Sequence, residues 1–386
     1  MNKIYLDNAS TTFPKPDVVS DSVYRYMTEL GANINRGCYN NAYSVEEAVY
    51  ETRELLADMF GAPDCKNVVF TKNITESLNI IIKGYLKPGD HVLVSSMEHN
   101  AIMRPLVQLE KSGVSFTRIP CKENGELCLD TLPSLLEANT KAIIMTHASN
   151  VCGTVMPLKE VGRFCKANSL RFIVDTAQTA GVLPVNMIDD NISALAFTGH
   201  KGLLGPQGIG GFILSEDMIS ELDPLISGGT GSISHTEEIP DFMPDKFEAG
   251  TLNLPGIIGL QASLNWIKGK TSQALLSHEL FLTKLLLKEL IPLEESGFIK
   301  IIGKKDTVNR TGIVSIRSQK VDQSELAYIL DTNYNIMTRV GLHCAPNAHK
   351  ILGTYPEGTV RISFGFNNNE ADVRALVKAL EEIYGI

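Results

Sequence analysis

The sequence lacks the long apolar segments and the basic blocks that mark membrane proteins and nucleic-acid-binding proteins. No run approaches the ~20 apolar residues of a membrane-spanning helix, and the first residues have no apolar stretch typical of a signal peptide. The net charge is −9, and acidic and basic residues are interspersed along the 386 residues. We therefore expect a cytoplasmic protein that binds neither membranes nor nucleic acid.

Paired cysteines are also missing. The seven cysteines form no Cys-x-x-Cys pair and are scattered over the chain: Cys38, Cys65, Cys121, Cys128, Cys152, Cys165 and Cys344. An odd, scattered set argues against a disulfide framework and against a structural zinc site. We expect no metal, and we expect most of these thiols to be small buried hydrophobic groups.

The motifs of nucleotide-binding proteins fail as well. Gly269-Lys-Thr271 looks like the end of a P-loop, but Leu264 stands where its first glycine is required. The glycine-rich stretch 205–211 does not match the dinucleotide fingerprint. Nucleotide hydrolysis and hydride transfer therefore have little support.

What the sequence does contain is an alternation of short apolar runs and helical patterns between about residues 67 and 215. Continuous apolar runs separated by helices predict a mainly parallel sheet buried on both faces. The seven strand candidates are Asn67–Thr71, His91–Ser96, Ser115–Pro120, Ala142–His147, Arg171–Asp175, Ala194–Thr198 and Gly210–Ser215. Helices are predicted at Val45–Phe60 and Ile74–Leu86.

After residue 257 the pattern changes. Two long helices are predicted, Ile258–Lys268 and Gln273–Leu290, the second ended by Pro292. The elements that follow do not alternate strictly: strands at 301–303, Gly312–Arg317 and Thr359–Phe364, and helices at Ser324–Leu330 and Glu370–Tyr384. We predict a large α/β domain over residues 15–257 and a small α+β domain from residues 1–14 and 258–386, with a ligand near their junction.

Lys201 and Asp175 are the strongest candidates for a functional site. Lys201, in Thr-Gly-His-Lys-Gly, follows one predicted strand, and Asp175 ends another. A lysine amine can form a Schiff base, and an acid can pair with a protonated pyridine nitrogen. These are two protein groups that pyridoxal phosphate needs. A solvated surface charge is the alternative for Lys201 taken alone.

Three other strand ends carry polar residues. Thr75, at the start of a predicted helix, could help to bind a phosphate or could simply cap that helix. His99 could stack on a cofactor ring and transfer protons, or be a buried hydrogen-bonded histidine. Asn150 could donate to a phenolate oxygen. Their recurrence at the ends of strands favours a site there.

Arg339-Val-Gly-Leu-His-Cys344 is a second candidate region. A nearby cation favours thiolate over thiol, so Cys344 could be nucleophilic and oxidisable rather than an inert structural cysteine. Arg361 lies within an apolar strand pattern, where it could bind a carboxylate or form a fixed internal salt bridge. Arg36 could bind an anion from a loop or be a solvated surface charge.

These segments make the sequence similar to the fold-type I, class V aminotransferase superfamily, and within it to the group II cysteine desulfurases and selenocysteine lyases. The resemblance runs nearly from end to end. It rests on Tyr5–Thr12, Val174–Gln178, Thr198–Lys201, Phe247–Thr251 and Arg339–Cys344.

The resemblance implies a role for each site residue. Lys201 would carry the Schiff base of pyridoxal phosphate, Asp175 would hold its pyridinium nitrogen, Gln178 would approach its ring hydroxyl, and His99 would stack on its ring. The other implied cofactor contacts are Thr75, the backbone of Glu76, Asn150, Thr198, His200 and, across a homodimer, Thr251.

The substrate residues implied in the same way are Arg361, Asn150, Arg339 and the partner subunit's Arg36. Free L-cysteine would give its sulfur to Cys344, leaving L-alanine and a persulfide that passes to a protein or small-thiol acceptor. The sulfur would serve iron–sulfur cluster assembly or another sulfur pathway. Departures from better-known members lie at Leu342, at Asn35 and in Pro346–Lys350, around the substrate and the sulfur-accepting loop.

Three alternatives remain at this point. A selenocysteine lyase could use the same pocket and dispense with Cys344, because selenolate leaves readily. Another class V transaminase or lyase would have Cys344 only incidentally. A non-catalytic dimeric scaffold would be expected to have lost Lys201, which is present.

Overall fold

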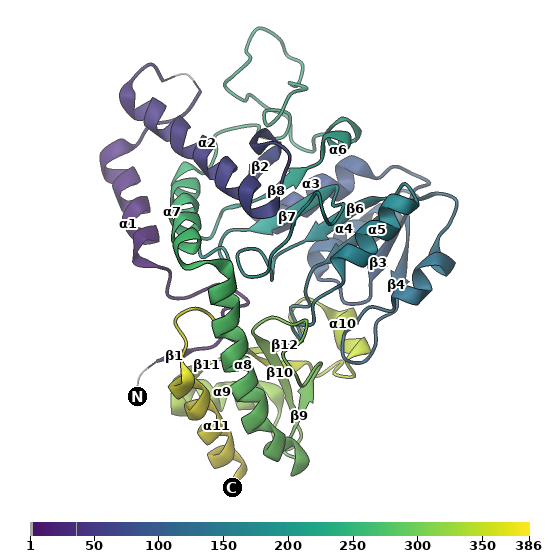
Figure 1. Ribbon diagram of the computed structural model, residues 1–386, viewed down its shortest axis with the longest axis vertical. Helices are drawn as coiled ribbons and strands as arrows, with labels where there is room; N and C mark the ends of the chain where they lie inside the picture. Colours follow the sequence, from purple (N-terminus) through teal and green to yellow (C-terminus); the bar gives the residue numbers. More distant parts are fainter. Residues whose placement is uncertain (1–2, 36) are drawn as a thin grey trace.

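The computed structural model describes residues 3–35 and 37–386, and the seven predicted strands form one sheet (Figure 1). Their order is β2-β8-β7-β6-β5-β3-β4, and only β8 runs antiparallel to its neighbours. The strands are β2 Val68–Thr71, β3 His91–Ser95, β4 Ser115–Ile119, β5 Thr140–Thr146, β6 Arg171–Asp175, β7 Ala194–Thr198 and β8 Gly210–Leu214. The predicted α/β class and mainly parallel sheet are confirmed.

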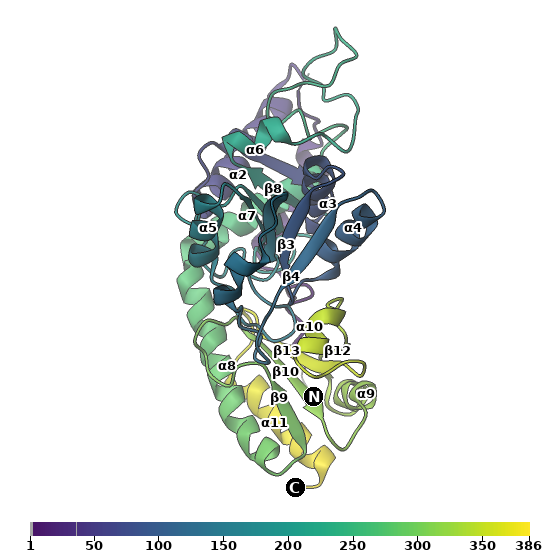
Figure 2. The ribbon, with the colours of Figure 1, turned by 90° about the vertical axis from the view of Figure 1, so that its right-hand side faces the viewer.

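Helices cover both faces of this sheet, which explains its nearly continuous apolar strands (Figure 2). Leu93 packs on one face with α2 (Asn40–Phe60), α5 (Leu158–Ala167) and α7 (Leu254–Lys270). Its neighbours Val92 and Val94 pack on the other face with α3 (Ile74–Tyr85) and α4 (Asn100–Glu110). Alternate residues of one strand thus enter two different cores.

A second, smaller sheet lies below the first in Figure 1. Its four antiparallel strands have the order β12-β13-β10-β9. The β1 strand (Ile4–Tyr5) pairs in parallel with β11 (Ile336–Met337), so the start of the chain joins this part of the molecule. The other elements here are β9 Ile299–Ile302, β10 Ile313–Ser318, β12 Arg339–Gly341, β13 Thr359–Ser363, α8 Ser272–Glu295, α9 Gln323–Tyr334, α10 Pro346–Ile351 and α11 Glu370–Tyr384.

Two details differ from the sequence predictions. Pro292 does not end the preceding helix, because α8 continues to Glu295 and Leu293 packs into the small core. The boundary predicted between residues 257 and 258 falls inside α7, whose first turn is capped by the side chain of Asn253. The proposed division into domains stays a prediction.

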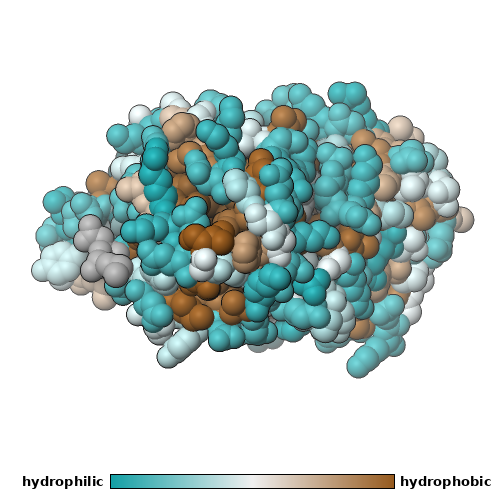
Figure 3. Space-filling view, turned by 90° about the horizontal axis from the view of Figure 1, so that it is seen from below, coloured by the Kyte–Doolittle hydropathy of each residue, from teal (hydrophilic) through white to brown (hydrophobic). Residues whose placement is uncertain are grey.

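The remaining elements lie mostly at the end far from the small sheet: α1 Asp17–Arg25, η1 Tyr26–Leu30, η2 Cys65–Asn67, η3 Leu129–Leu135 and α6 Glu216–Glu221. Between α6 and α7 a long segment projects from that end (Figure 1). The face seen from below is mainly hydrophilic, with a group of hydrophobic residues near its centre (Figure 3). None of the helices described is long and apolar enough to cross a membrane.

Candidate active site

Lys201 and Asp175 come from neighbouring strands. Asp175 ends β6, and Lys201 follows β7, which pairs with β6. Burial lowers the pKa of Lys201 to about 8, although the charge of Asp175 opposes this shift. Burial also raises the pKa of Asp175, whose Oδ1 accepts the N–H of Ala177 at 2.8 Å. The lysine amine is therefore more readily neutral, and so more nucleophilic, than a solvated one.

His99 lies at the start of α4. Its Nδ1 accepts the backbone N–H of Ala101 at 3.0 Å, so the neutral ring carries its proton on Nε2. Burial, followed by the charges of Lys201 and Arg104, lowers the pKa of His99 to about 4. Arg361 and Arg339 act in the same direction. The structure thus brings His99, Lys201 and the two arginines into one electrostatic environment.

Two buried polar atoms beside Lys201 have no partner. Within residues 3–35 and 37–386, Oγ1 of Thr198 and Nδ1 of His200 are buried without a hydrogen bond. Such groups normally find a partner, so they fit a site that binds a polar ligand. Burial and the charges of Lys201 and Lys15 lower the pKa of His200 to about 4, so its ring is neutral at neutral pH.

The start of α3 differs from one sequence interpretation. Asn73, not Thr75, caps this helix, and its Oδ1 accepts the N–H of Glu76 at 3.0 Å. The alternative of a Thr75 cap is therefore wrong. Thr75 is exposed in the first turn. A ligand that used the N–H of Glu76 would share it with the Asn73 side chain.

The N-terminal segment crosses the Lys201 loop. Thr12 donates its hydroxyl to the carbonyl oxygen of Lys201 at 2.8 Å, and Lys15 Nζ donates to that of His200 at 2.6 Å. Gln178 Nε2 donates to the carbonyl oxygen of Ala9 at 3.2 Å. Residues 5–12 carry part of the family resemblance, but the spacing of that motif assigns none of them a role and does not reveal these long-range contacts.

Arg361 and Arg339 are cross-strand neighbours on β13 and β12. Arg361 NH2 contacts Asp7 Oδ1 at 2.9 Å, and Arg361 NH1 donates to the carbonyl oxygen of Asn150 at 3.0 Å. An internal salt bridge, the alternative considered for Arg361, is therefore present. Asp7 was missed because nothing local connects it to an arginine more than 350 residues away.

Three hydrogen bonds fix the Cys344 segment to residues that follow strands β3 and β5 of the large sheet. Asn150 Nδ2 donates to the carbonyl oxygen of His343 at 2.7 Å, and the N–H of Asn100 donates to that of Cys344 at 2.8 Å. Asn347 Nδ2 donates to the carbonyl oxygen of Ser96 at 2.7 Å. His343 and Cys344 have φ angles of +47° and +57°, a backbone conformation that residues other than glycine rarely adopt unless surrounding hydrogen bonds hold them in it. The Cys344 side chain is exposed.

One predicted residue, Thr251, lies apart from this cluster. Thr251 lines a cavity of about 260 Å³ together with Glu76 and Lys72 at the start of α3. Arg36 lies outside the described residues. Over the described ranges, no three His, Cys, Asp or Glu side chains are placed to hold a metal ion.

Comparisons with known proteins agree with this architecture. Residues 4–376 match the model of the aminotransferase class-V family. A probable cysteine desulfurase from Methanothermobacter thermautotrophicus is 34% identical over 388 residues, covering 99% of this chain and 95% of that protein. A probable cysteine desulfurase from Aeropyrum pernix is 33% identical over 395 residues, covering 98% and 94%.

Solved structures give the same picture. The apo structure of the cysteine desulfurase from Thermococcus onnurineus has a TM-score of 0.93 at 31% identity, covering 100% of this chain and 95% of that one. The cysteine desulfurase CsdA from Escherichia coli has a TM-score of 0.88 at 28% identity, covering 99% and 95%. The fold and these matches define an α/β enzyme. The chain belongs to the aminotransferase class-V family, whose members use pyridoxal phosphate.

Proposed function

We propose that this chain is a cysteine desulfurase that converts L-cysteine to L-alanine and carries the sulfur as a persulfide on Cys344. The observation that carries the proposal is the hydrogen bond from Asn100 to the carbonyl oxygen of Cys344. It holds the backbone of Cys344 beside the residue that follows His99, and the charge of Lys201 acts on His99. Relatives of this family named probable cysteine desulfurase support the same conclusion.

The residues fit pyridoxal phosphate. Lys201 would hold the aldehyde carbon, Asp175 the pyridine nitrogen, and His99 the face of the ring. The unpartnered atoms of Thr198 and His200 would serve the phosphate. Bound there, the cofactor would supply the electron sink that makes the bonds at the substrate's Cα and Cβ labile.

The chain's own groups would do the rest of the work. Arg361 would bind the substrate carboxylate, and the Lys201 amine, with its pKa lowered to about 8, would accept and return the Cα proton. The Cys344 thiolate would attack the substrate sulfur, so that the new S–S bond forms as the sulfur–Cβ bond breaks. The released carbon skeleton would take up protons to become alanine.

The persulfide would then be consumed by exchange. An acceptor thiolate attacks the outer sulfur, takes it as its own persulfide and returns Cys344 as a thiolate. The Cys344 side chain is exposed, but its backbone is held by hydrogen bonds. We therefore propose that the acceptor approaches Cys344 in place, rather than that the Cys344 segment moves out to the acceptor. Either a small thiol or a cysteine on an extended protein segment would satisfy this requirement.

A homodimer is part of the proposal. Large apolar side chains are exposed on α1, η1 and α2 and on the segment between α6 and α7. They include Tyr24, Met27, Tyr43, Leu225 and Phe242. An apolar surface of this kind favours association with another protein surface, and the family resemblance favours a second copy of this chain.

The test is alanine and sulfide production from L-cysteine by the purified holoenzyme with a reductant, in the wild type, Cys344→Ala and Lys201→Ala. We expect loss of all turnover in Lys201→Ala and loss of cysteine turnover in Cys344→Ala, with an unchanged cofactor spectrum in the latter. Sulfide production that survives in Cys344→Ala would exclude the persulfide mechanism. Selenocysteine cleavage without cysteine turnover in the wild type would identify a selenocysteine lyase instead.

A further inference from the structure

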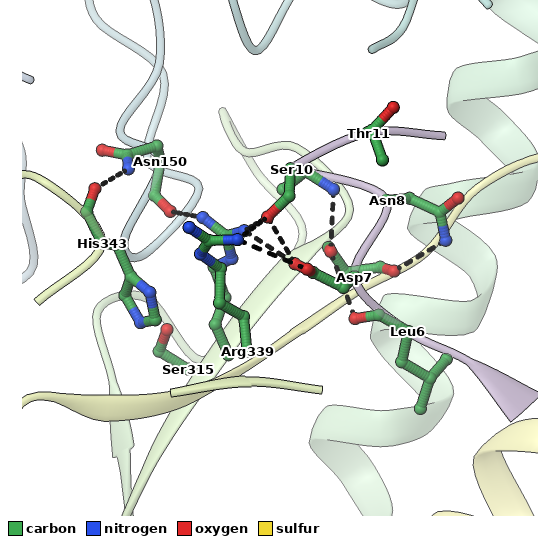
Figure 4. Close-up of polar contacts among 12 residues, drawn as sticks. Leu6, Asp7, Asn8, Ser10, Thr11, Asn150, Ser315, Arg339 and His343 are labelled. Carbon is green, nitrogen blue, oxygen red and sulfur yellow. Dashed lines mark hydrogen bonds and ion pairs between the residues drawn. The ribbon is translucent and has the colours of Figure 1, made fainter. Parts of the chain in front are cut away.

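The two arginines proposed to meet the substrate already hold a carboxylate of this chain. Arg361 NH2 lies 2.9 Å from Asp7 Oδ1, and Arg339 NH1 lies 3.7 Å from Asp7 Oδ2. Ser10 Oγ accepts from both guanidinium groups, at 2.7 Å from Arg361 and 3.0 Å from Arg339, and donates to Asp7 Oδ1 at 2.7 Å. Figure 4 shows Asp7 and Ser10, from the N-terminal segment, pointing toward Arg339 from the small sheet.

The hydrogen-bonding capacity of Arg361 is limiting. A guanidinium group can bind a carboxylate by two parallel N–H bonds along either of two edges, one formed by Nε and NH2 and the other by NH1 and NH2. Both edges include NH2. The two hydrogens of NH2 are taken by Asp7 and Ser10, and NH1 also donates to Asn150. In the part of the chain that the structure describes, Nε is the one nitrogen of Arg361 without a partner. A second carboxylate can therefore bind by two hydrogen bonds only if NH2 is released.

The burial of Arg361 explains why it needs Asp7 as a partner in the absence of substrate. The Arg361 side chain is 3% exposed, so its charge needs a partner when no substrate is bound. The Arg339 side chain is 46% exposed and already lies beside Asp7, so it can keep the Asp7 charge paired after Arg361 lets go. Asp7 can therefore break its ion pair with Arg361 and keep its ion pair with Arg339.

We propose that Asp7 is a built-in competitor for the substrate carboxylate, and that substrate binding transfers Asp7 from Arg361 to Arg339. The proposal rests on the proposed function in taking Arg361 as the receptor of an amino acid's carboxylate. Asp7 is then a positioning residue that holds the empty receptor in place and lowers its affinity. Arg339 receives Asp7 rather than the substrate.

The direct test compares the wild-type and Asp7→Asn holoenzymes by calorimetry with 3-mercaptopropionate, which has the carboxylate but no amino group. Asparagine keeps the shape of the side chain and removes the competing charge, so we expect binding about tenfold tighter. Its uncharged isostere, 3-mercaptopropionamide, should bind the two proteins equally. Unchanged or weaker binding of the acid to Asp7→Asn would overturn the proposal, since a merely structural Asp7 would support binding.

Kinetics give a second readout. For L-cysteine we expect a lower KM in Asp7→Asn with kcat changed by less than about twofold, because only ground-state binding is altered. A lower kcat with a raised KM would instead indicate that Asp7 only orients Arg361. The binding experiment needs no turnover, so it remains decisive for a protein that fails to release sulfur from cysteine.

A structure of the wild-type holoenzyme with 3-mercaptopropionate covers the case in which Asp7→Asn does not fold. We expect the carboxylate of the probe on Arg361 and the Asp7 side chain on Arg339 alone. A probe carboxylate gripped by Arg361 while the bond from NH2 to Asp7 persists would refute the transfer. A probe that binds away from Arg361 would refute the receptor itself.

Discussion

The backbone N–H of Asn100 donates to the carbonyl oxygen of Cys344 at 2.8 Å, joining the first turn of α4 to the segment that carries the candidate nucleophile. Asn100 directly follows His99, which is proposed to stack on the cofactor. A displacement of the Cys344 segment would therefore disturb the start of α4, next to the proposed cofactor site. The position of the thiol and the shape of this proposed site are thus expected to depend on each other.

Asn347 offers a way to loosen this connection without touching the reacting groups. In Asn347→Ala the hydrogen bond to the carbonyl oxygen of Ser96 is lost, at a cost of about 1 kcal/mol in stability. We expect faster amide hydrogen exchange at residues 342–350 and a kcat for L-cysteine several-fold lower, because Cys344 spends less time in position. The cofactor spectrum should not change.

Asn168 provides the matched control. Its Nδ2 donates to the carbonyl oxygen of Phe164 at the end of α5, where the side chain is exposed. Asn168→Ala should leave both hydrogen exchange at residues 342–350 and kcat as in the wild type. If Asn347→Ala behaves like this control, the segment is held sufficiently by Asn100 and Asn150 alone.

Features formed by residues close together in the chain could be predicted from the sequence, whereas contacts between residues far apart in the chain could not. The strands of the large sheet are local apolar runs, and their ends carry Asp175 and Thr198, so the position of the predicted cofactor site follows from periodicity and the rule for parallel sheets. The contact between Asp7 and Arg361 joins two ends of the chain. No local pattern contains it, and the same holds for Asn347 and Ser96.

Glu98 makes the stability of the protein depend on pH. Its carboxylate accepts from the N–H of Thr146 and the hydroxyl of Ser95, yet burial raises its pKa from 4.5 to about 8. Above pH 4.5 the unfolded chain releases this proton while the folded protein keeps it, so the contribution of Glu98 to stability should fall as the pH rises towards 8. Relative to the wild type, Glu98→Gln should become more stable in urea denaturation as the pH rises between these values, by at most about 1.4 kcal/mol per pH unit.

The stability of Glu98→Gln should still depend on pH. Burial also raises the pKa of Asp175 and of Glu279, which contributes in the same direction, and it lowers the pKa of buried histidines such as His99, His147 and His200, which contributes in the opposite direction. Glu110→Gln, at an exposed position at the end of α4, should keep the slope of the wild type. A Glu98→Gln protein with that same slope would mean that Glu98 is ionised in the folded protein across this range.

Gly162 allows α5 to pack closely against the backbone of Asp190. A Cβ added at Gly162 would lie 1.8 Å from the carbonyl oxygen of Asp190, which belongs to the backbone and cannot rotate away. We expect Gly162→Ala to destabilise the protein by at least about 1–3 kcal/mol, the usual cost of overpacking. Gly269→Ala, near the end of α7, meets nothing within 4 Å, so its thermal unfolding midpoint should stay level or rise, consistent with the roughly 0.5 kcal/mol that alanine gains over glycine in a helix. A Gly162→Ala protein that unfolds at the temperature of Gly269→Ala would require α5 to move away from Asp190, which a crystal structure of that variant would reveal.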